Sequence, residues 1–587
     1  MVGEKKDRKR MWQIVSIILV ALYAVMFALN WKFSLALFPL ILVVVGMVVF
    51  RLGGSMMAMI GWLVAILLAV VAFNTDWQVT ILGSIEGLLK SLGIGVAVIF
   101  TMYLIFLMKE EGLLTTVASS LKRVAKTRED QALFIGIGFG TFATSLGIVT
   151  PALFPPLLLA MGFTPLGAVA IAVLGYNAST SFALLSLPIT LPADVSSGLT
   201  DGPVGGSGFA GIEFAFFICL FLPVISIGIS FAMLYIIGGK SSVKKGAFPA
   251  FIVGSAVAFS CLGFVAYEYL TGNTAVPLRV VGVAAGLLSM GSLYGYQVVL
   301  DRWREKRGIE VVDERTVADG DKEERIDWPK VLRAYSPLII LTVLAAIVGI
   351  KSVSEFLADL PGDWEVIKVA ENKFVDLNIL AQIYTWILVA IVISILYLKP
   401  KREVLVNTNK VWVKRIWSPF IAYSVFFAIA YVMAYSAMKM EGGAIVPSES
   451  FDDFNMNAVM AAGLAAAFGT GYMWISSSLG LFGAIVGGSE TGSNVLFMNV
   501  QYNTADQVGM LESSNGLIND KFMAMYGGHG VAGGVASAIT PSKVNNAVVT
   551  IGEGPEMEAL VMRKLLLVTI VLVLVINVMT GIFVSLF

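Results

Sequence analysis

Long, nearly continuous apolar runs recur along the whole chain and limit what it can fold into. A helix needs about 20 apolar residues to cross the hydrocarbon core of a bilayer, and the clearest runs are near or above that length. They are Trp12–Leu29, Phe33–Phe50, Met56–Phe73, Gly93–Met108, Phe214–Ile237, Pro337–Ile350, Ile379–Leu398 and Leu565–Phe587. Hydrophobic residues make up 57% of the chain, against about 45–50% in soluble domains. We therefore expect an all-α polytopic membrane protein with roughly 12–14 transmembrane helices.

Charged and metal-binding residue types exclude several classes of protein. The formal net charge is zero and Lys and Arg are spread over short loops, which argues against a nucleic-acid partner. Cys219 and Cys261 lie in separate apolar runs, where each is expected to be a core residue and not half of a disulfide. His529 is the single histidine of the sequence, so a multi-histidine metal site is excluded. We expect no metal and no cofactor, and the sequence has no nucleotide-binding loop.

The distribution of charge between the runs predicts the topology. Residues 3–10 are rich in Lys and Arg and precede the first run without a cleavage site, so we expect an uncleaved first helix with a cytoplasmic N-terminus. Counting spans from there puts the basic loops 109–130 and 399–416 inside. Loops 191–211, 352–377 and 438–458, which are acidic or uncharged on balance, then fall outside. The expected location is the plasma membrane.

Two apolar stretches, 129–239 and 440–520, contain no Lys or Arg but are broken by small and polar residues. Gly136–Pro151 holds four Gly, four Ser or Thr and a Pro, too many for an unstrained continuous helix. Close helix packing also favours small residues. At this density, however, the freed backbone must be buried in protein or face a cavity, and carriers bind their substrates at such midplane cavities.

The two broken stretches resemble each other. Phe139-Gly140 is followed by Phe154, and Phe482-Gly483 is followed at the same spacing by Phe497. Upstream, Met108–Gly112 is echoed by Met438–Gly442. The topology places the first of these segments inside and the second outside, so we expect inverted repeats with broken or re-entrant helices, as in many secondary carriers.

At these motifs the chain resembles the lactate permease family of lactate and glycolate carriers. The first core motif of that family reads here as Asp130-Gln131, Phe139-Gly140, Thr150-Pro151, Gly162–Pro165, Asn177 and Leu187-Pro188. The second is intact as Gly488–Phe497, and a shorter match is Val331–Pro337. The resemblance covers most of residues 85–560. It implies secondary transport of L-lactate, with D-lactate and glycolate as further candidates, by proton symport.

The chain departs from the family pattern at three places. Residues Ala143–Ile148 replace a segment that usually begins with an acidic residue, and the lysine before the family's last Pro motif has no counterpart at Ser537–Pro541. Residues 520–534 form an insertion that carries Lys521 and His529. These departures leave the carrier class unchanged.

The expected organisation alternates scaffold helices with two core repeats. Its segments are N-terminal scaffold helices 1–80; a first repeat 81–240 with broken core 136–188; scaffold helices 241–300; a charged cytoplasmic linker 301–334; scaffold helices 335–416; a second repeat 417–560 with broken core 480–542; and a C-terminal transmembrane helix 561–587.

A hydroxycarboxylate in a low-dielectric site needs converging hydrogen-bond donors, which broken helices and hydroxyl groups supply. From the first half we expect substrate contacts from Thr144, Ser145, Thr150, Asn177, Ser179, Thr180 and Ser181. From the second half we expect them from Ser489, Thr491, Ser493, Asn494, Asn515 and Thr540. Asn177 and Asn515 are expected to bond exposed backbone at the unwound turns. Lys543 is either a counter-charge to the substrate or a lysine that reaches the cytoplasmic surface.

Glu490 is the acidic residue of the intact second motif and the expected coupling residue. A carboxyl group inside a membrane is by default functional, and burial favours its neutral form, which suits a proton carrier. A Na⁺ site built from this carboxylate with hydroxyl and carbonyl oxygens is the alternative. His529 lies among glycines, and we expect a loop histidine without a partner; a pH-sensing role is the alternative.

Other functions remain open at this point. The chain could carry another small organic anion, although a dicarboxylate would need a second cationic group. An intramembrane enzyme would need a nucleophile–base pair or a metal site, and one histidine with two separated cysteines provides neither. A passive channel fits inverted broken repeats less well. The sequence does not indicate the oligomeric state.

Overall fold

The computed structural model describes most of the chain. It covers residues 23–48, 50, 52–122, 125, 127–147, 150–200, 208–307, 327–360, 362–487, 489–511 and 520–587. Asn515 and most of the predicted charged linker 301–334 therefore lie outside the described residues, as does most of the first apolar run.

The described part of the first half is helical. Its regular helices are α2 (Trp31–Val48), α3 (Gly54–Val71), α4 (Trp77–Glu110), α5 (Leu113–Lys122), α6 (Arg128–Leu133), α7 (Gly140–Ser145), α8 (Thr150–Ala160), α9 (Pro165–Leu174), α10 (Ala183–Thr200), α11 (Gly211–Thr271) and α12 (Val281–Glu305). Irregular turns interrupt them at η1 (Phe134–Phe139), η2 (Gly175–Phe182) and η3 (Leu278–Val280). Helix α11 is itself broken at Gly238 and Gly239, so it forms two helices in succession.

The second half repeats this mixture of long helices and breaks. Its helices are α14 (Trp328–Gly349), α15 (Lys351–Asp359), α16 (Ile383–Leu398), α17 (Arg402–Arg415), α18 (Trp417–Ala434), α19 (Phe451–Phe454), α20 (Met456–Phe468), α21 (Ser478–Gly487), α22 (Glu490–Gln507), α23 (Asp520–Ala536), α24 (Pro541–Thr550) and α25 (Pro555–Leu586). The short 3₁₀ turns are η4 (Gly362–Glu365), η5 (Gly469–Trp474) and η6 (Ser537–Ile539).

The helices confirm a polytopic membrane protein. Among the described residues, seven helices are long and apolar enough to cross a membrane, and the number rises to nine if each of two bent helix pairs counts as one span. One bent pair joins Pro165–Ser179 to Ala183–Ser196 at 48°, and the other joins Met456–Trp474 to Ser478–Ile485 at 109°. Helices α2 and α16 are apolar but shorter. The larger number of spans expected from the sequence remains a prediction.

Two antiparallel β-hairpins depart from the all-helical expectation. Strands β1 (Val366–Ala370) and β2 (Lys373–Asp376) form one, and β3 (Met438–Glu441) and β4 (Ala444–Pro447) form the other. The hairpins join at their tips, because the Asn372 side chain donates to the carbonyl oxygen of Ile445 (2.8 Å) and accepts from its backbone N–H (2.9 Å). Both lie in segments that the sequence predicts as outer loops, and strands this short leave little periodic signal.

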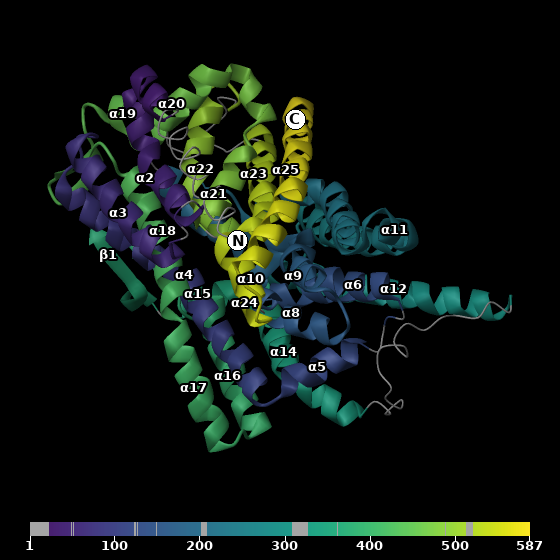
Figure 1. Cartoon of the computed structure of the whole chain (residues 1–587). Helices are drawn as coiled ribbons and strands as arrows, with labels where there is room; N and C mark the ends of the chain where they lie inside the picture. Colours follow the sequence, from purple (N-terminus) through teal and green to yellow (C-terminus); the bar gives the residue numbers. More distant parts are fainter. Residues whose placement is uncertain are drawn as a thin grey trace, which may run out of the picture.

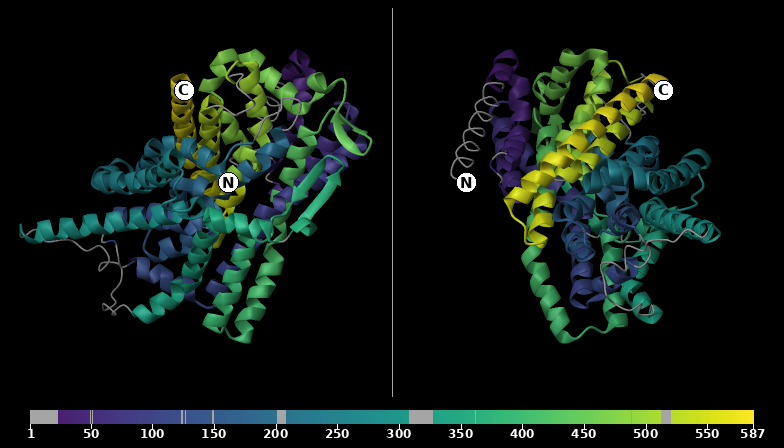
Figure 2. Two further views of the ribbon diagram at one scale, coloured as in Figure 1. Left: turned by 180° about the vertical axis from the view of Figure 1, so that it is seen from behind. Right: turned by 45° about the vertical axis from the view of Figure 1, so that its right-hand side comes forward.

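The regular helices pack into a body around the broken segments (Figure 1). Helix α18 packs against α3 and α4, and the backbones of α4 and α18 come so close at Gly87 that a Cβ there would lie 2.7 Å from the carbonyl oxygen of Phe427. Helices α21, α22, α23 and α25 form a second packed group. Helices α11 and α12 pack together and project to one side in all views (Figure 2).

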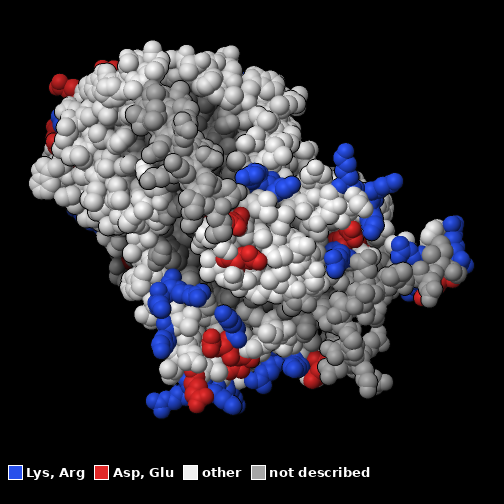
Figure 3. Space-filling model, viewed as in Figure 1, with Lys and Arg blue, Asp and Glu red and all other residues white. Residues whose placement is uncertain are grey.

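Charged side chains are unevenly spread over the face shown in Figure 3. The upper part presents mostly uncharged side chains, whereas Lys and Arg lie at the lower end, at mid-height and on the right-hand side. The uncharged part fits a surface that faces lipid, and the charged parts fit surfaces that face water. The broken segments η2, α10 and α22 lie inside the body, where the candidate site is found.

Candidate functional site

The broken segments of the two halves meet through three hydrogen bonds. The Ser181 hydroxyl donates to Oε1 of Glu490 (2.5 Å), and the Asn494 amide Nδ2 donates to the carbonyl oxygen of Pro188 (2.9 Å). The Ser537 hydroxyl donates to Oδ1 of Asn177 (2.9 Å). Each pair joins residues more than 300 positions apart in the chain. The structure therefore places candidate residues of both halves in one buried site.

In the first half, the backbone turns away from helical geometry directly after Asn177. Ser179 has φ −149°, and Leu184, Leu185 and Ser186 have φ values of 49°, 58° and 64°. Such left-handed conformations cost residues with a Cβ roughly 1–2 kcal/mol each. Asn177 helps to hold the turn, because its Nδ2 donates to the carbonyl oxygen of Val173 (2.9 Å).

In the second half, Glu490 occupies the first turn of α22. Ser489 caps this helix, and its hydroxyl accepts from the backbone N–H of Gly492 (3.1 Å). The Glu490 side chain is buried, with only 3% of the residue exposed. Its Oε1 accepts from Ser181, whereas its buried Oε2 has no hydrogen-bond partner among the described residues. A buried carboxyl group with one free oxygen favours the neutral form or a ligand that satisfies that oxygen.

Three further candidate residues present buried oxygens without partners. They are Oγ1 of Thr144, Oδ1 of Asn494 and Oγ1 of Thr540, again within the described part of the chain. Native proteins rarely leave buried polar atoms unsatisfied, so each such atom calls for an explanation. Asn494 lies one helical turn after Glu490, and the two side chains therefore share a face of α22.

Lys543 supplies positive charge to this site. It lies in the first turn of α24, which begins after Thr540, and its Nζ is 5.8 Å from the centre of the Tyr176 ring. It also interacts electrostatically with Glu490 and with Tyr423. Lys543 is partly buried, and both sequence-based interpretations of it, a counter-charge to the substrate and a lysine that reaches the cytoplasmic surface, stay predictions.

The remaining candidates are divided among several environments. The Ser179 hydroxyl donates to Oγ1 of Thr141 (3.2 Å), and Ser145 is buried against Gly282 of α12. Thr491 is buried in the first turn of α22. The side chains of Thr150 and Thr180 lie outside the described residues, as does the whole of Asn515. Among the described residues, no three His, Cys, Asp or Glu lie together as a metal site would require.

The expectation of a loop histidine without a partner is wrong. His529 is fully buried in α23, which contains the predicted insertion 520–534. Its Nδ1 lies 3.0 Å from Nε2 of Gln501, and its Nε2 lies 3.1 Å from the Ser493 hydroxyl. The glycines around it do not form a loop but allow close helix packing: a Cβ on Gly528 would clash with the hydroxyl groups of Thr580 and Ser477.

The hydrogen bonds around His529 indicate its protonation state. Gln501 Nε2 can only donate, so Nδ1 of His529 accepts and Nε2 carries the hydrogen, which points to the Ser493 carbonyl oxygen at 3.3 Å. The Gln501 oxygen in turn accepts from the Tyr472 hydroxyl (2.8 Å). An imidazolium would set two donors against each other at Nδ1. His529 is therefore a neutral link between α22 and α23.

Sequence reasoning missed several residues of this region. Gln501 and Tyr472 complete the histidine cluster, and the Tyr526 hydroxyl donates to the carbonyl oxygen of Asn494 (2.7 Å). The spacing of Tyr526 and His529 places both on one face of a helix, and that spacing is the signal that identifies them. Tyr423 belongs to α18, which lies in the predicted second repeat 417–560 but outside its broken core 480–542, so nothing local marks it.

Known proteins similar to this chain include a family, two relatives and one solved structure. The family model described as L-lactate permease matches residues 32–587. An L-lactate permease of Bacillus subtilis is 24% identical over 513 residues, which cover 81% of this chain and 84% of the relative. A glycolate permease of Escherichia coli is 25% identical over 531 residues, covering 84% and 87%. The crystal structure of the Alcanivorax borkumensis YdaH transporter aligns with 91% of this chain and 99% of its own at 13% identity and a TM-score of 0.42.

Proposed function

This chain belongs to the L-lactate permease family, and on that premise we propose that it carries L-lactate across the plasma membrane together with protons. Family membership makes the chain a multi-pass membrane transporter of a small organic anion and not an enzyme. The names of its relatives support L-lactate as the first substrate to test and glycolate as the second; D-lactate is the third. The charge distribution between the spans supports a cytoplasmic N-terminus.

The proposed binding site for the substrate lies between Glu490, Asn494, Thr540 and Lys543. The Lys543 ammonium group would balance the substrate carboxylate, and the first turns of α22 and α24 contribute backbone N–H groups and helix dipoles of the right sign. The unpartnered oxygens of Asn494 and Thr540 would accept from, or rotate to donate to, the substrate hydroxyl and carboxylate.

The observation that carries the coupling proposal is the environment of the Glu490 carboxyl group. It is buried, receives one hydrogen bond from Ser181 and has one oxygen without a partner. In the proposed cycle Glu490 takes a proton from the outer solution, which removes its charge and leaves Lys543 free to pair with the substrate. Release of the proton on the inner side restores the Glu490–Lys543 attraction and expels the anion. Uptake should therefore fall as the outer pH rises.

The test is transport by purified protein in proteoliposomes. An inward proton gradient should stimulate L-lactate uptake by the Glu490→Gln variant at least about 100-fold less than uptake by the wild type. Exchange of labelled for unlabelled L-lactate should continue in the variant. Gln keeps the size and one carbonyl oxygen of Glu, so the comparison isolates the titratable proton. Unchanged proton-driven uptake by this variant would refute the coupling role. Failure of the wild-type protein to exchange L-lactate, while exchanging another acid, would redirect the substrate.

Sodium coupling is the second candidate because the same unpartnered atoms are hard oxygen ligands. Glu490 Oε2, Asn494 Oδ1 and a nearby hydroxyl would provide part of a Na⁺ shell. The positive charge of Lys543 weighs against a cation at this place. Uptake driven by a Na⁺ gradient at equal pH on both sides would favour this alternative, and uptake driven by pH without Na⁺ would favour the proton.

A further inference from the structure

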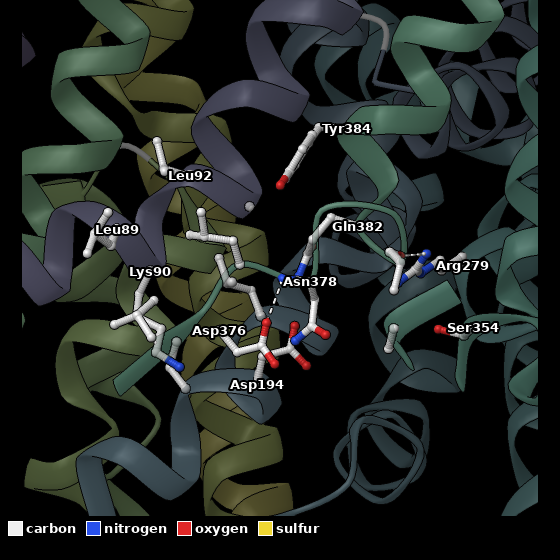
Figure 4. Close-up of a pocket in the computed structure, with 17 residues that line it drawn as sticks. Leu89, Lys90, Leu92, Asp194, Arg279, Ser354, Asp376, Asn378, Gln382 and Tyr384 are labelled. Atoms are coloured by element: carbon white, nitrogen blue, oxygen red, sulfur yellow. Dashed lines mark hydrogen bonds between the residues drawn. The ribbon is translucent and has the colours of Figure 1, made fainter. Parts of the chain in front are cut away.

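A polar cavity of about 320 Å³ lies apart from the Glu490 site (Figure 4). Helices α4, α10, α15 and α16, the turn η3 and the strand β2 all contribute to its wall. The volume is within the range of small-molecule sites, roughly 300–1,000 Å³. None of the residues expected from the sequence to bind substrate lines this cavity, and the proposed transport cycle does not use it.

Charged side chains from separate elements converge on the cavity without neutralising one another. Lys90 of α4 and Arg279 of η3 lie on opposite sides of Asp194 of α10 in Figure 4. Both cations act electrostatically on Asp194. In the part of the chain that the structure describes, however, the side chains of Lys90 and Asp194 form no hydrogen bond or ion pair. Arg279 uses one nitrogen, Nη1, to donate to the carbonyl oxygen of Ala381 (3.0 Å).

This arrangement of charge selects the class of ligand. A metal cation at Asp194 would be opposed by Lys90 and Arg279 on either side of it. Asp194 and Asp376 offset the two cations, so the wall lacks the net positive charge that a dicarboxylate would need. A monocarboxylate with a neighbouring hydroxyl fits better, because its carboxylate can pair with the two cations while its hydroxyl donates to Asp194.

The cavity and the Glu490 site share helix α10. Asn494 of α22 binds the carbonyl oxygen of Pro188, and Asp194 lies six residues further along α10, about 9 Å along its axis. The side chain of Asp194 is exposed, so solvent reaches the cavity. A ligand held here would contact the same broken helix that meets the coupling residue.

We propose that this cavity is a second binding site, a vestibule that holds a small hydroxymonocarboxylate through Lys90, Arg279 and Asp194 before it reaches the Glu490 site. This inference rests on the proposed function for the identity of the ligand. It does not rest on Glu490, because the binding groups of the vestibule belong to other elements.

The test uses a cysteine in the cavity wall. Ser354 of α15 lines the cavity, whereas Ser352 lies two residues earlier on the same helix, is exposed and does not line it. Both native cysteines are buried and free, so the background of labelling is low. We expect saturating L-lactate to slow labelling of the Ser354→Cys variant by a small thiol reagent at least about five-fold. Labelling of Ser352→Cys should be unaffected by L-lactate.

Double variants, each with Ser354→Cys and one further substitution, distinguish protection that comes from the vestibule from protection that comes from the transport site. Protection by L-lactate should persist with Glu490→Gln, and its half-protecting concentration should rise about ten-fold with Lys90→Gln. Lys90 makes no bond to the protein in the described residues, so this change removes charge without removing a structural contact. Arg279→Gln should produce a similar rise, after a check that the variant folds.

The outcomes distinguish this inference from the proposed function. Normal L-lactate uptake without protection at position 354 would overturn the vestibule and leave transport standing. Protection that disappears with Glu490→Gln would also overturn it, because the signal would then come from the transport site. Protection in a protein that cannot transport L-lactate would support the vestibule and overturn the proposed transport function instead.

Discussion

The two halves both interrupt their helices at the buried site, but they contribute different chemical groups to it. In the first half, the turn from η2 into α10 is built from left-handed residues and contributes hydroxyl and carbonyl groups, through Ser181 and Pro188. In the second half, α22 and α24 start afresh from Ser489 and Thr540 and contribute the charged groups. The first region is a neutral partner, and the second carries the acid and the cation. The predicted inverted repeats would therefore differ in chemistry at their centres.

In the second region, the largest loss of stability is expected from replacing His529, which links α22 to α23. In His529→Ala, Gln501 and Ser493 lose a partner in a buried place, and a cavity remains; together these cost about 2–4 kcal/mol of stability. Thermal unfolding of purified protein in detergent measures the loss. The more conservative His529→Gln should recover part of it. The pH dependence of uptake by His529→Gln should match that of the wild type, and a shifted profile would contradict a neutral structural role.

Removal of the Lys543 ammonium group should cost a similar or somewhat smaller free energy, measured in this case as weaker binding of L-lactate. Lys543→Ala removes a charged partner of the substrate, an interaction worth about 1.5–3 kcal/mol, and so should raise the half-saturating L-lactate concentration about 10–100-fold. Lys543→Arg keeps the charge and is the matched control. Initial uptake rates over a range of L-lactate concentrations provide the measurement. An unchanged half-saturating concentration in Lys543→Ala would remove Lys543 from the binding site.

Ser181 tests whether the neutral region contributes to coupling. Ser181→Ala deletes the donor to Glu490, a bond worth about 0.5–1.5 kcal/mol, and should lower proton-driven uptake roughly 2–10-fold. In a Glu490→Gln background the same substitution should have little further effect, because the two residues act as a pair. If the effects of Ser181→Ala and Glu490→Gln on proton-driven uptake are fully additive, the contact between the two residues does not serve coupling.

The smallest effect is expected at the contact between Ser537 and Asn177. Ser537→Ala removes one neutral hydrogen bond between the halves, at a cost of about 1 kcal/mol in stability. The half-saturating L-lactate concentration should stay within about two-fold of the wild type, since neither atom of this bond is free to bind substrate. A large rise in that concentration would move Ser537 from a structural to a binding role.

Sequence reasoning predicts broken segments because their cause is local. Pro removes a helical hydrogen bond, and Gly, Ser and Asn lower helix propensity where they cluster, as in residues 175–192. The pairing of Ser181 with Glu490 could not be predicted, since it joins residues 309 positions apart through packing. His529 was misread because glycines mark both loops and close helix contacts. The vestibule was missed because its charged residues come from different elements and no motif connects them.

The hydrogen bonds between the halves also set the order in which the protein can be made. Ribosomes add about 5–20 residues per second, so Ser181 emerges about 15–60 seconds before Glu490. During that interval Ser181 is present in the nascent chain without Glu490, and a chain that stops before residue 537 never supplies the second-half partner of Asn177. Translation must therefore be nearly complete before the transport site can exist, and truncated products are substrates for quality control and not for partial function.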